Sequence, residues 1–155
     1  MSIPWFTPTH LSATEPGMFT LKTSITFAAS HKLWNENWSQ SKNFEVYGKC
    51  SNPNGHGHNY TVAVKVKGDV NPNTGMVINL DDIKRVLKSH IYERVDHKNL
   101  NLDIDFLKGK VPTAEILAFE FWKLLVPHFR NGVELCAVTV MESEKNVVTY
   151  KGGES

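Results

Sequence analysis

The fold and the chemistry of this chain are organised around one stretch, Lys49-Cys50-Ser51-Asn52-Pro53-Asn54-Gly55-His56-Gly57-His58-Asn59-Tyr60. Residues 52–55 combine Asn, Pro and Gly, which favour a turn, and an alternating strand pattern follows them. Side chains two positions apart on a strand point to the same side, so His56 and His58 can bind one ion. Cys50 lies outside this histidine pair, and we expect it beside the metal as a nucleophile or base.

The strand expected before this stretch supplies a third histidine. Residues 19–31 alternate, and one face carries Leu21, Thr23, Ile25, Phe27, Ala29 and His31. The strand expected from His58 to Lys67 continues the face of its two histidines with Tyr60, Val62, Val64 and Val66. Three neutral imidazoles leave one position open on Zn²⁺, as in catalytic sites, although iron or copper would accept the same ligands. The shared parity therefore predicts a metal site made of His31, His56 and His58.

The rest of the chain predicts an α+β fold with two helices on one sheet face. Residues 1–17 lack periodicity and form an N-terminal extension, whereas residues 32–49 form a loop that can act as a lid. A helix is expected from about residue 79 to residue 95, and a second one opens at Pro112 and stops before Pro127. Short strands are expected at residues 76–78, 134–142 and 147–150.

Further side chains qualify as site residues when each is weighed against a structural role. Asp96-His97 is either an acid–base pair or a favourable helix-end pair. Glu142 ends the apolar face of its strand, where a carboxylate is costly unless it meets donors such as a guanidine-like ligand edge. Cys136 lies among apolar strand residues and is expected to fill the core.

The composition favours a single soluble domain over residues 18–155. The 155 residues are 41% hydrophobic with a net charge of +1, and no basic run favours nucleic acid or a membrane surface. Two cysteines make no disulfide framework and favour a reducing compartment. We find no signal peptide and no membrane-spanning stretch in the sequence, so a cytoplasmic protein is expected.

Six ordered motifs resemble the 6-pyruvoyl-tetrahydropterin synthase family, which also holds the bacterial 6-carboxy-tetrahydropterin synthases of queuosine biosynthesis. The resemblance runs from about Phe19 to Gly152. Its motifs are residues 27–31, 48–60, 75–80, 96–101 and 112–115, together with Glu142.

This resemblance implies a tunnelling fold (T-fold), in which a four-stranded antiparallel sheet with two helices assembles as a barrel-forming trimer, commonly a hexamer. It implies zinc on His31, His56 and His58 and a catalytic set of Cys50, Asp96 and His97, which neighbouring subunits can share. It also implies a pterin held by Glu142, with help from Thr113 and Glu115.

The implied reaction is conversion of 7,8-dihydroneopterin triphosphate to 6-pyruvoyl-tetrahydropterin with loss of triphosphate. The spacing from Cys50 to His56 is similar to that of the pyruvoyl enzymes, whereas Pro112-Thr113-Ala114-Glu115 is more similar to the bacterial carboxy branch. A pyruvoyl product, a carboxy product and a non-catalytic zinc- or pterin-binding module therefore all remain open from the sequence.

Overall fold

A five-stranded sheet forms the centre of the computed structural model, which describes residues 17–153. The strand order is β3-β1-β2-β4-β5, and every neighbouring pair is antiparallel except β1 and β3. The strands are β1 (Phe19–His31), β2 (His56–Gly68), β3 (Lys98–Asn99), β4 (Val133–Met141) and β5 (Val147–Tyr150). The predicted extension over residues 1–17 lies, apart from Gly17, outside the described residues.

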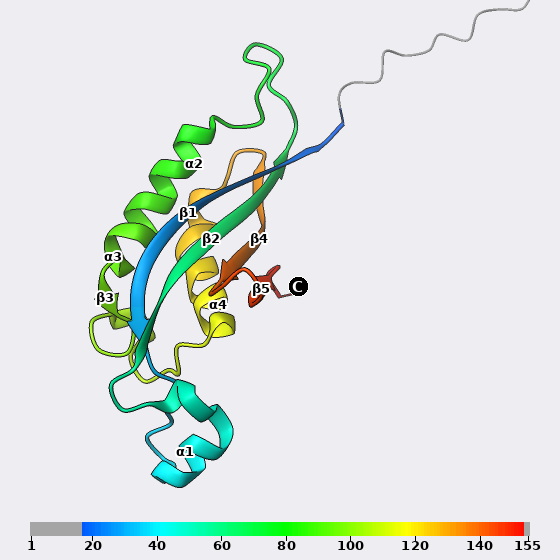
Figure 1. The fold of residues 1–155 in the computed structure, drawn as a ribbon. Helices are drawn as coiled ribbons and strands as arrows, with labels where there is room; N and C mark the ends of the chain where they lie inside the picture. The colour runs from blue at the N-terminus through cyan, green and yellow to red at the C-terminus, as the bar shows by residue number, and fades with distance from the viewer. Residues whose placement is uncertain (1–16, 154–155) are drawn as a thin grey trace, which may run out of the picture.

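Two helical segments cover one face of this sheet (Figure 1). The first runs from α2 (Leu80–Leu87) through a π-helical turn (Lys88–Tyr92) into α3 (Glu93–Val95), and the second is α4 (Ala114–Leu125). Asn79 and Thr113 cap α2 and α4 because their side-chain oxygens accept backbone N–H groups of the first turn. Ile83, Leu87, Leu117 and Phe121 from these helices are fully buried in one core cluster with Tyr60, Val62 and Val64 of β2.

The α+β T-fold is confirmed, but its strands differ in two ways from the expected four-stranded sheet. The fifth strand, β3, has only two residues and pairs with β1 at the sheet edge. The strand expected at residues 76–78 is absent, since this segment makes only an isolated bridge between Asn71 and Met76. Among residues 17–153, no helix is long and apolar enough to cross a bilayer.

The expected loop over residues 32–49 contains a helix, α1 (Gln40–Tyr47), followed by a 3-10 turn (Gly48–Ser51). Ser39 caps α1 by accepting the backbone N–H of Lys42. Fully buried Asn43 ties the helix to the chain before it: its amide group donates to the carbonyl oxygens of Asn35, Trp38 and Ser39. This helical lobe extends beyond the ends of β1 and β2 (Figure 1).

A β-bulge overturns the prediction that Cys136 fills the core. Val66 pairs with Leu135 and Lys65 pairs with Ala137, so Cys136 is the extra residue of β4. The bulge shifts the strand parity, and the thiol is left half-buried beside Lys67 and Glu134. Beyond the bulge, Val138 and Val140 face the core as expected.

Candidate functional site

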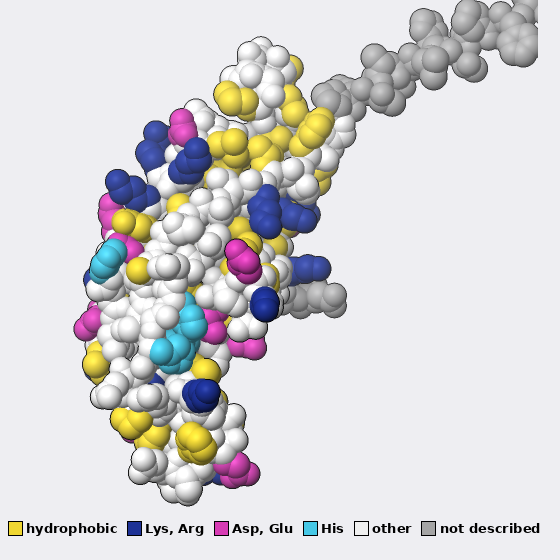
Figure 2. Space-filling model, in the orientation of Figure 1, with side chains coloured by type: hydrophobic (Ala, Val, Ile, Leu, Met, Phe, Trp, Pro, Cys, Tyr) yellow, Lys and Arg dark blue, Asp and Glu magenta, His cyan; other side chains and the backbone are white. Residues whose placement is uncertain are grey.

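The three predicted histidines meet where β1 ends and β2 begins. His31 pairs with His56 across the strands, and Ala29 pairs with His58, so the three imidazoles share the core side of the sheet. One ring nitrogen from each histidine lies within 4.8 Å of the others, which makes the group able to hold a metal ion. Figure 2 shows histidine side chains gathered near the end of the sheet, towards α1.

The donor chemistry of these histidines fits a metal. The Pro112 carbonyl lies 2.9 Å from Nδ1 of His31; because a carbonyl only accepts, Nδ1 carries the proton and Nε2 offers its lone pair. Within residues 17–153, Nε2 of His58 is buried without a hydrogen-bond partner. Burial lowers the pKa of both His31 and His58, which keeps their imidazoles in the neutral form that binds metal.

Glu142 follows β4 directly and lies against the triad. Its carboxylate oxygens are 3.8 Å from Nε2 of His31 and 3.7 Å from Nε2 of His58. The side chain is 19% exposed, so it faces both the histidines and solvent. Strand parity thus predicted its orientation, and the structure adds its closeness to the ring nitrogens of the triad.

Sequence reasoning missed Tyr60 as part of this site, although it stands on the same alternating face as His56 and His58. Its hydroxyl lies 3.3 Å from both ring nitrogens of buried His31. Burial, followed by the negative charges of Glu142 and Cys50, raises the pKa of Tyr60. The phenol therefore stays protonated and can act as a buried donor next to both acidic groups.

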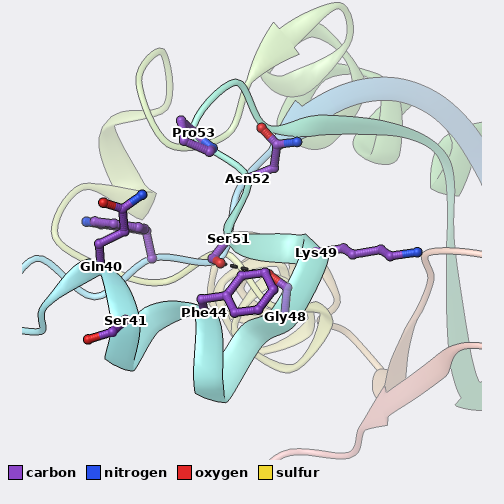
Figure 3. Close-up of a pocket in the computed structure, with 9 residues that line it drawn as sticks. Gln40, Ser41, Phe44, Gly48, Lys49, Ser51, Asn52 and Pro53 are labelled. Carbon is purple, nitrogen blue, oxygen red and sulfur yellow. Dashed lines mark hydrogen bonds between the residues drawn. The ribbon is translucent and has the colours of Figure 1, made fainter.

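Cys50 lies in the 3-10 turn after α1 and is half-buried. Its carbonyl oxygen accepts the N–H of Leu33 at 2.8 Å, which joins this turn to the chain leaving β1. A hollow of about 620 Å³ adjoins the turn. In Figure 3, Phe44 of α1 lies across this hollow near Ser51 and Gly48, while the side chain of Lys49 extends away from it.

Asp96 and His97 form the expected pair, with Oδ2 of Asp96 2.7 Å from Nδ1 of His97. Oδ1 of Asp96 accepts the backbone N–H of Ala28 at 3.0 Å, and this bond, followed by that from His97, lowers the pKa of Asp96. The side chain of His97 is 82% exposed. The pair is therefore assembled, with Asp96 held in its ionised form and the His97 ring open to solvent.

The side chain of His97 opens onto a hollow over the ends of β1 and β2. This hollow of about 440 Å³ is lined by His97 together with residues of β1 and β2, including His58 of the triad. Among them, Ala28, Ser30 and Asn59 alternate with the core-facing residues of their strands. Glu142 thus lies 3.8 Å and 3.7 Å from two of the triad nitrogens, whereas the His97 side chain is 82% exposed and bonds to Asp96.

Two further predicted residues lie at the start of α4. Thr113 is the N-cap, and its hydroxyl accepts the N–H of Ile116 at 3.3 Å. Glu115 stands exposed in the first turn of the helix. The preceding Pro112 lies outside the helix, where its carbonyl reaches His31.

We expect the metal-free chain to lose stability as the pH falls below about 6.5, the ordinary histidine pKa. Burial lowers the pKa of His31 and His58 in the folded state. Just below about pH 6.5 the unfolded chain therefore binds more protons than the folded chain. The free energy of unfolding then rises with pH. Urea unfolding with a chelator at about pH 7.5 and about pH 5.5 measures this difference. Equal or greater stability at the acidic pH would contradict the assignment of buried neutral imidazoles.

Comparisons with known proteins agree with the family that the sequence motifs resemble. The family model described as 6-pyruvoyl tetrahydropterin synthase matches residues 20–153. The 6-pyruvoyl tetrahydrobiopterin synthase of Homo sapiens is 44% identical over 128 residues, covering 83% of this chain and 88% of the human protein. The Drosophila melanogaster enzyme of that name is 39% identical, covering 82% of this chain and 76% of its own length.

Solved structures of proteins with this family name have the same fold. The structure of Caenorhabditis elegans 6-pyruvoyl tetrahydropterin synthase superposes with a TM-score of 0.82 at 40% identity, covering 88% of this chain and 97% of that one. A Plasmodium vivax protein of the same name superposes with a TM-score of 0.64 over 87% of this chain and 98% of its own. At 15% identity, this second likeness supports the fold alone.

Proposed function

Because this chain belongs to the 6-pyruvoyl tetrahydropterin synthase family, we propose that it is a zinc-dependent 6-pyruvoyl-tetrahydropterin synthase. It converts 7,8-dihydroneopterin triphosphate to 6-pyruvoyl-tetrahydropterin and releases triphosphate. The observation that carries the proposal is the convergence of three histidines beside Tyr60, whose pKa Glu142 and Cys50 help to raise. One of these histidines has a buried nitrogen without a partner in the described part of the chain.

His31, His56 and His58 would hold the zinc ion, which matches the three-ligand pattern of catalytic zinc sites. Bound there, zinc supplies Lewis acidity, which lowers the pKa of hydroxyl groups on a substrate side chain. The Pro112 carbonyl keeps the ring of His31 in the tautomer that leaves Nε2 free.

Cys50 takes the role of the base that removes a proton from a carbon of the substrate side chain. It stands in a polar turn rather than in the core, and a nearby cation favours the thiolate form of such a cysteine. The Asp96–His97 pair is the second acid–base group, in which the carboxylate orients the imidazole through the 2.7 Å contact.

Glu142, Glu115 and Thr113 bind the pterin. A carboxylate pairs well with the two parallel N–H donors of the pyrimidine edge, and Glu142 offers such a group where the apolar face ends. Glu115 is exposed at the N-terminus of α4, so it adds a second carboxylate, and the capping Thr113 shapes that turn. Fixing the ring in this way orients the side chain for reaction.

The proposed enzyme works as a homo-oligomer, a trimer or hexamer. The side chain of His97 is 82% exposed, which leaves the Asp96–His97 pair free to serve the site of a neighbouring copy. Exposed edge strands such as β5 favour the same conclusion, because pairing with another copy covers their free backbone groups.

Subunit sharing predicts that two inactive variants complement each other. Cys50→Ala and His97→Ala should each reduce turnover by about 10²-fold or more. Mixed oligomers, made by co-expression with two different tags and double purification, should regain turnover because some sites receive an intact Cys50 and an intact His97. Mixed oligomers no more active than either parent would show that both residues act from one chain.

Product identification tests the function itself. The purified protein is incubated with dihydroneopterin triphosphate, and the pterin product is identified by mass. A pyruvoyl product with released triphosphate supports the proposal. A carboxy product would assign the chain to the queuosine branch, and binding without turnover would make it a non-catalytic pterin-binding module.

A further inference from the structure

Glu120 is a buried charged residue that the proposed mechanism does not use. It lies on α4, is 4% exposed, and its two carboxylate oxygens meet Lys110 Nζ at 2.8 Å and Lys123 Nζ at 2.7 Å. Burial acts to raise its pKa, but the hydrogen bonds from the two lysines outweigh burial and lower it. A charge buried in this way is costly unless it is fully paired, so Glu120 holds both lysines in place.

The two lysines differ in what they attach to Glu120. Lys123 lies on α4 itself, three residues further along the helix. Lys110 instead belongs to the segment before α4, and its Nζ also donates to the Phe106 carbonyl at 2.7 Å. The ion pair with Lys110 therefore fastens residues 106–110 to the helix. The ion pair with Lys123 instead joins two residues of the same helix.

The fastened segment leads directly to the ligand environment of the metal. Two residues after Lys110, the carbonyl of buried Pro112 accepts the Nδ1–H of His31 at 2.9 Å. The N–H of Thr113 donates to the Val111 carbonyl at 2.8 Å, which closes a three-residue turn around Pro112. The proline ring further fixes this turn. A displacement of Lys110 should therefore also displace the Pro112 carbonyl.

We propose that Glu120, acting through Lys110, is a positioning residue that holds the Pro112 carbonyl against His31 and so sets the ring orientation for metal binding. This inference rests on the proposed metal site. It gives a role to a buried ion pair that lies outside the six sequence motifs. Partners of metal ligands typically change affinity by about 10–100-fold when removed. Because Lys110 acts one step further out, we expect a smaller effect, about threefold to tenfold.

The two lysines provide a matched pair of variants for the test. Lys110→Met and Lys123→Met each remove one cation from Glu120 at nearly equal distance. Competition with a chromogenic chelator should show about threefold to tenfold weaker zinc binding for Lys110→Met. Lys123→Met should stay within about twofold of the unmodified chain, and Lys110→Arg should restore binding because a guanidinium can reach both partners. Equal losses in both methionine variants, or no loss in Lys110→Met, would overturn the inference.

The tautomer of His31 gives a readout that does not need the metal. In the ¹⁵N spectrum of the metal-free chain, His31 should carry its proton on Nδ1 alone. Lys110→Met should show a mixture of tautomers, and Lys123→Met should not. If the unmodified chain binds no zinc, the proposed function fails, while this spectrum still decides the inference: an unchanged tautomer in Lys110→Met would refute it.

Discussion

Cys50→Ala should lower turnover by about 10²–10⁴-fold, the range that general acid–base groups contribute, while fold and zinc binding stay intact. This corresponds to about 3–5 kcal/mol of transition-state stabilisation. The fold should survive because the hydrogen bond that joins this turn to Leu33 uses the backbone carbonyl of Cys50 and not its thiol. Steady-state rates and metal content, measured on the same preparation, separate the two effects.

The second cysteine is the control for this experiment. Cys136 lies at the β4 bulge beside Lys67 and Glu134, among groups that take no part in the proposed site. Cys136→Ala should therefore leave turnover near that of the unmodified chain. Turnover of Cys50→Ala within a few-fold of the unmodified chain would make Cys50 structural and leave the chemistry to Asp96 and His97.

The double variant His56→Ala/His58→Ala should lose zinc binding and, with it, measurable turnover. It removes two of the three imidazoles that lie within 4.8 Å of one another, and the remaining His31 cannot hold the ion alone. The backbone pairing of β1 with β2 does not depend on these side chains, so the sheet should form. Metal content by mass spectrometry and circular dichroism test both statements.

A second histidine pair offers a matched control. His90 of the π-helical turn and His128 after α4 lie with ring centroids 3.9 Å apart, outside the triad. His90→Ala/His128→Ala removes the same number of imidazoles and should keep the zinc. Full metal occupancy in His56→Ala/His58→Ala, or equal loss in both double variants, would rule out the assigned ligands.

The sequence predicted the histidine triad because the side-chain period of a strand is strict. Two strands with a period of two residues determine on which side each side chain lies, and this places His31, His56 and His58 together without knowledge of the tertiary structure. The capping residues of α2 and α4 were likewise local signals. Glu142 was placed on the correct face for the same reason.

Other features depend on contacts that a strand or helix pattern does not contain. Helix α1 has no continuous apolar stripe and is held by Ser39 and Asn43, so its residues resembled a loop. Strand β3 is two residues long and exists only because it pairs with β1. The bulge at Cys136 breaks the period on which its burial was predicted. The carbonyl of Pro112 is a backbone group, so no pattern of side chains predicts its hydrogen bond with His31.

The most direct test of zinc-dependent pterin synthesis is a zinc titration of the metal-free protein with dihydroneopterin triphosphate as substrate. The rate of 6-pyruvoyl-tetrahydropterin formation, followed by mass, should be zero with chelator present and rise to a plateau near one zinc ion per triad. Full turnover by the metal-free protein, or no product at any zinc concentration, would contradict the account.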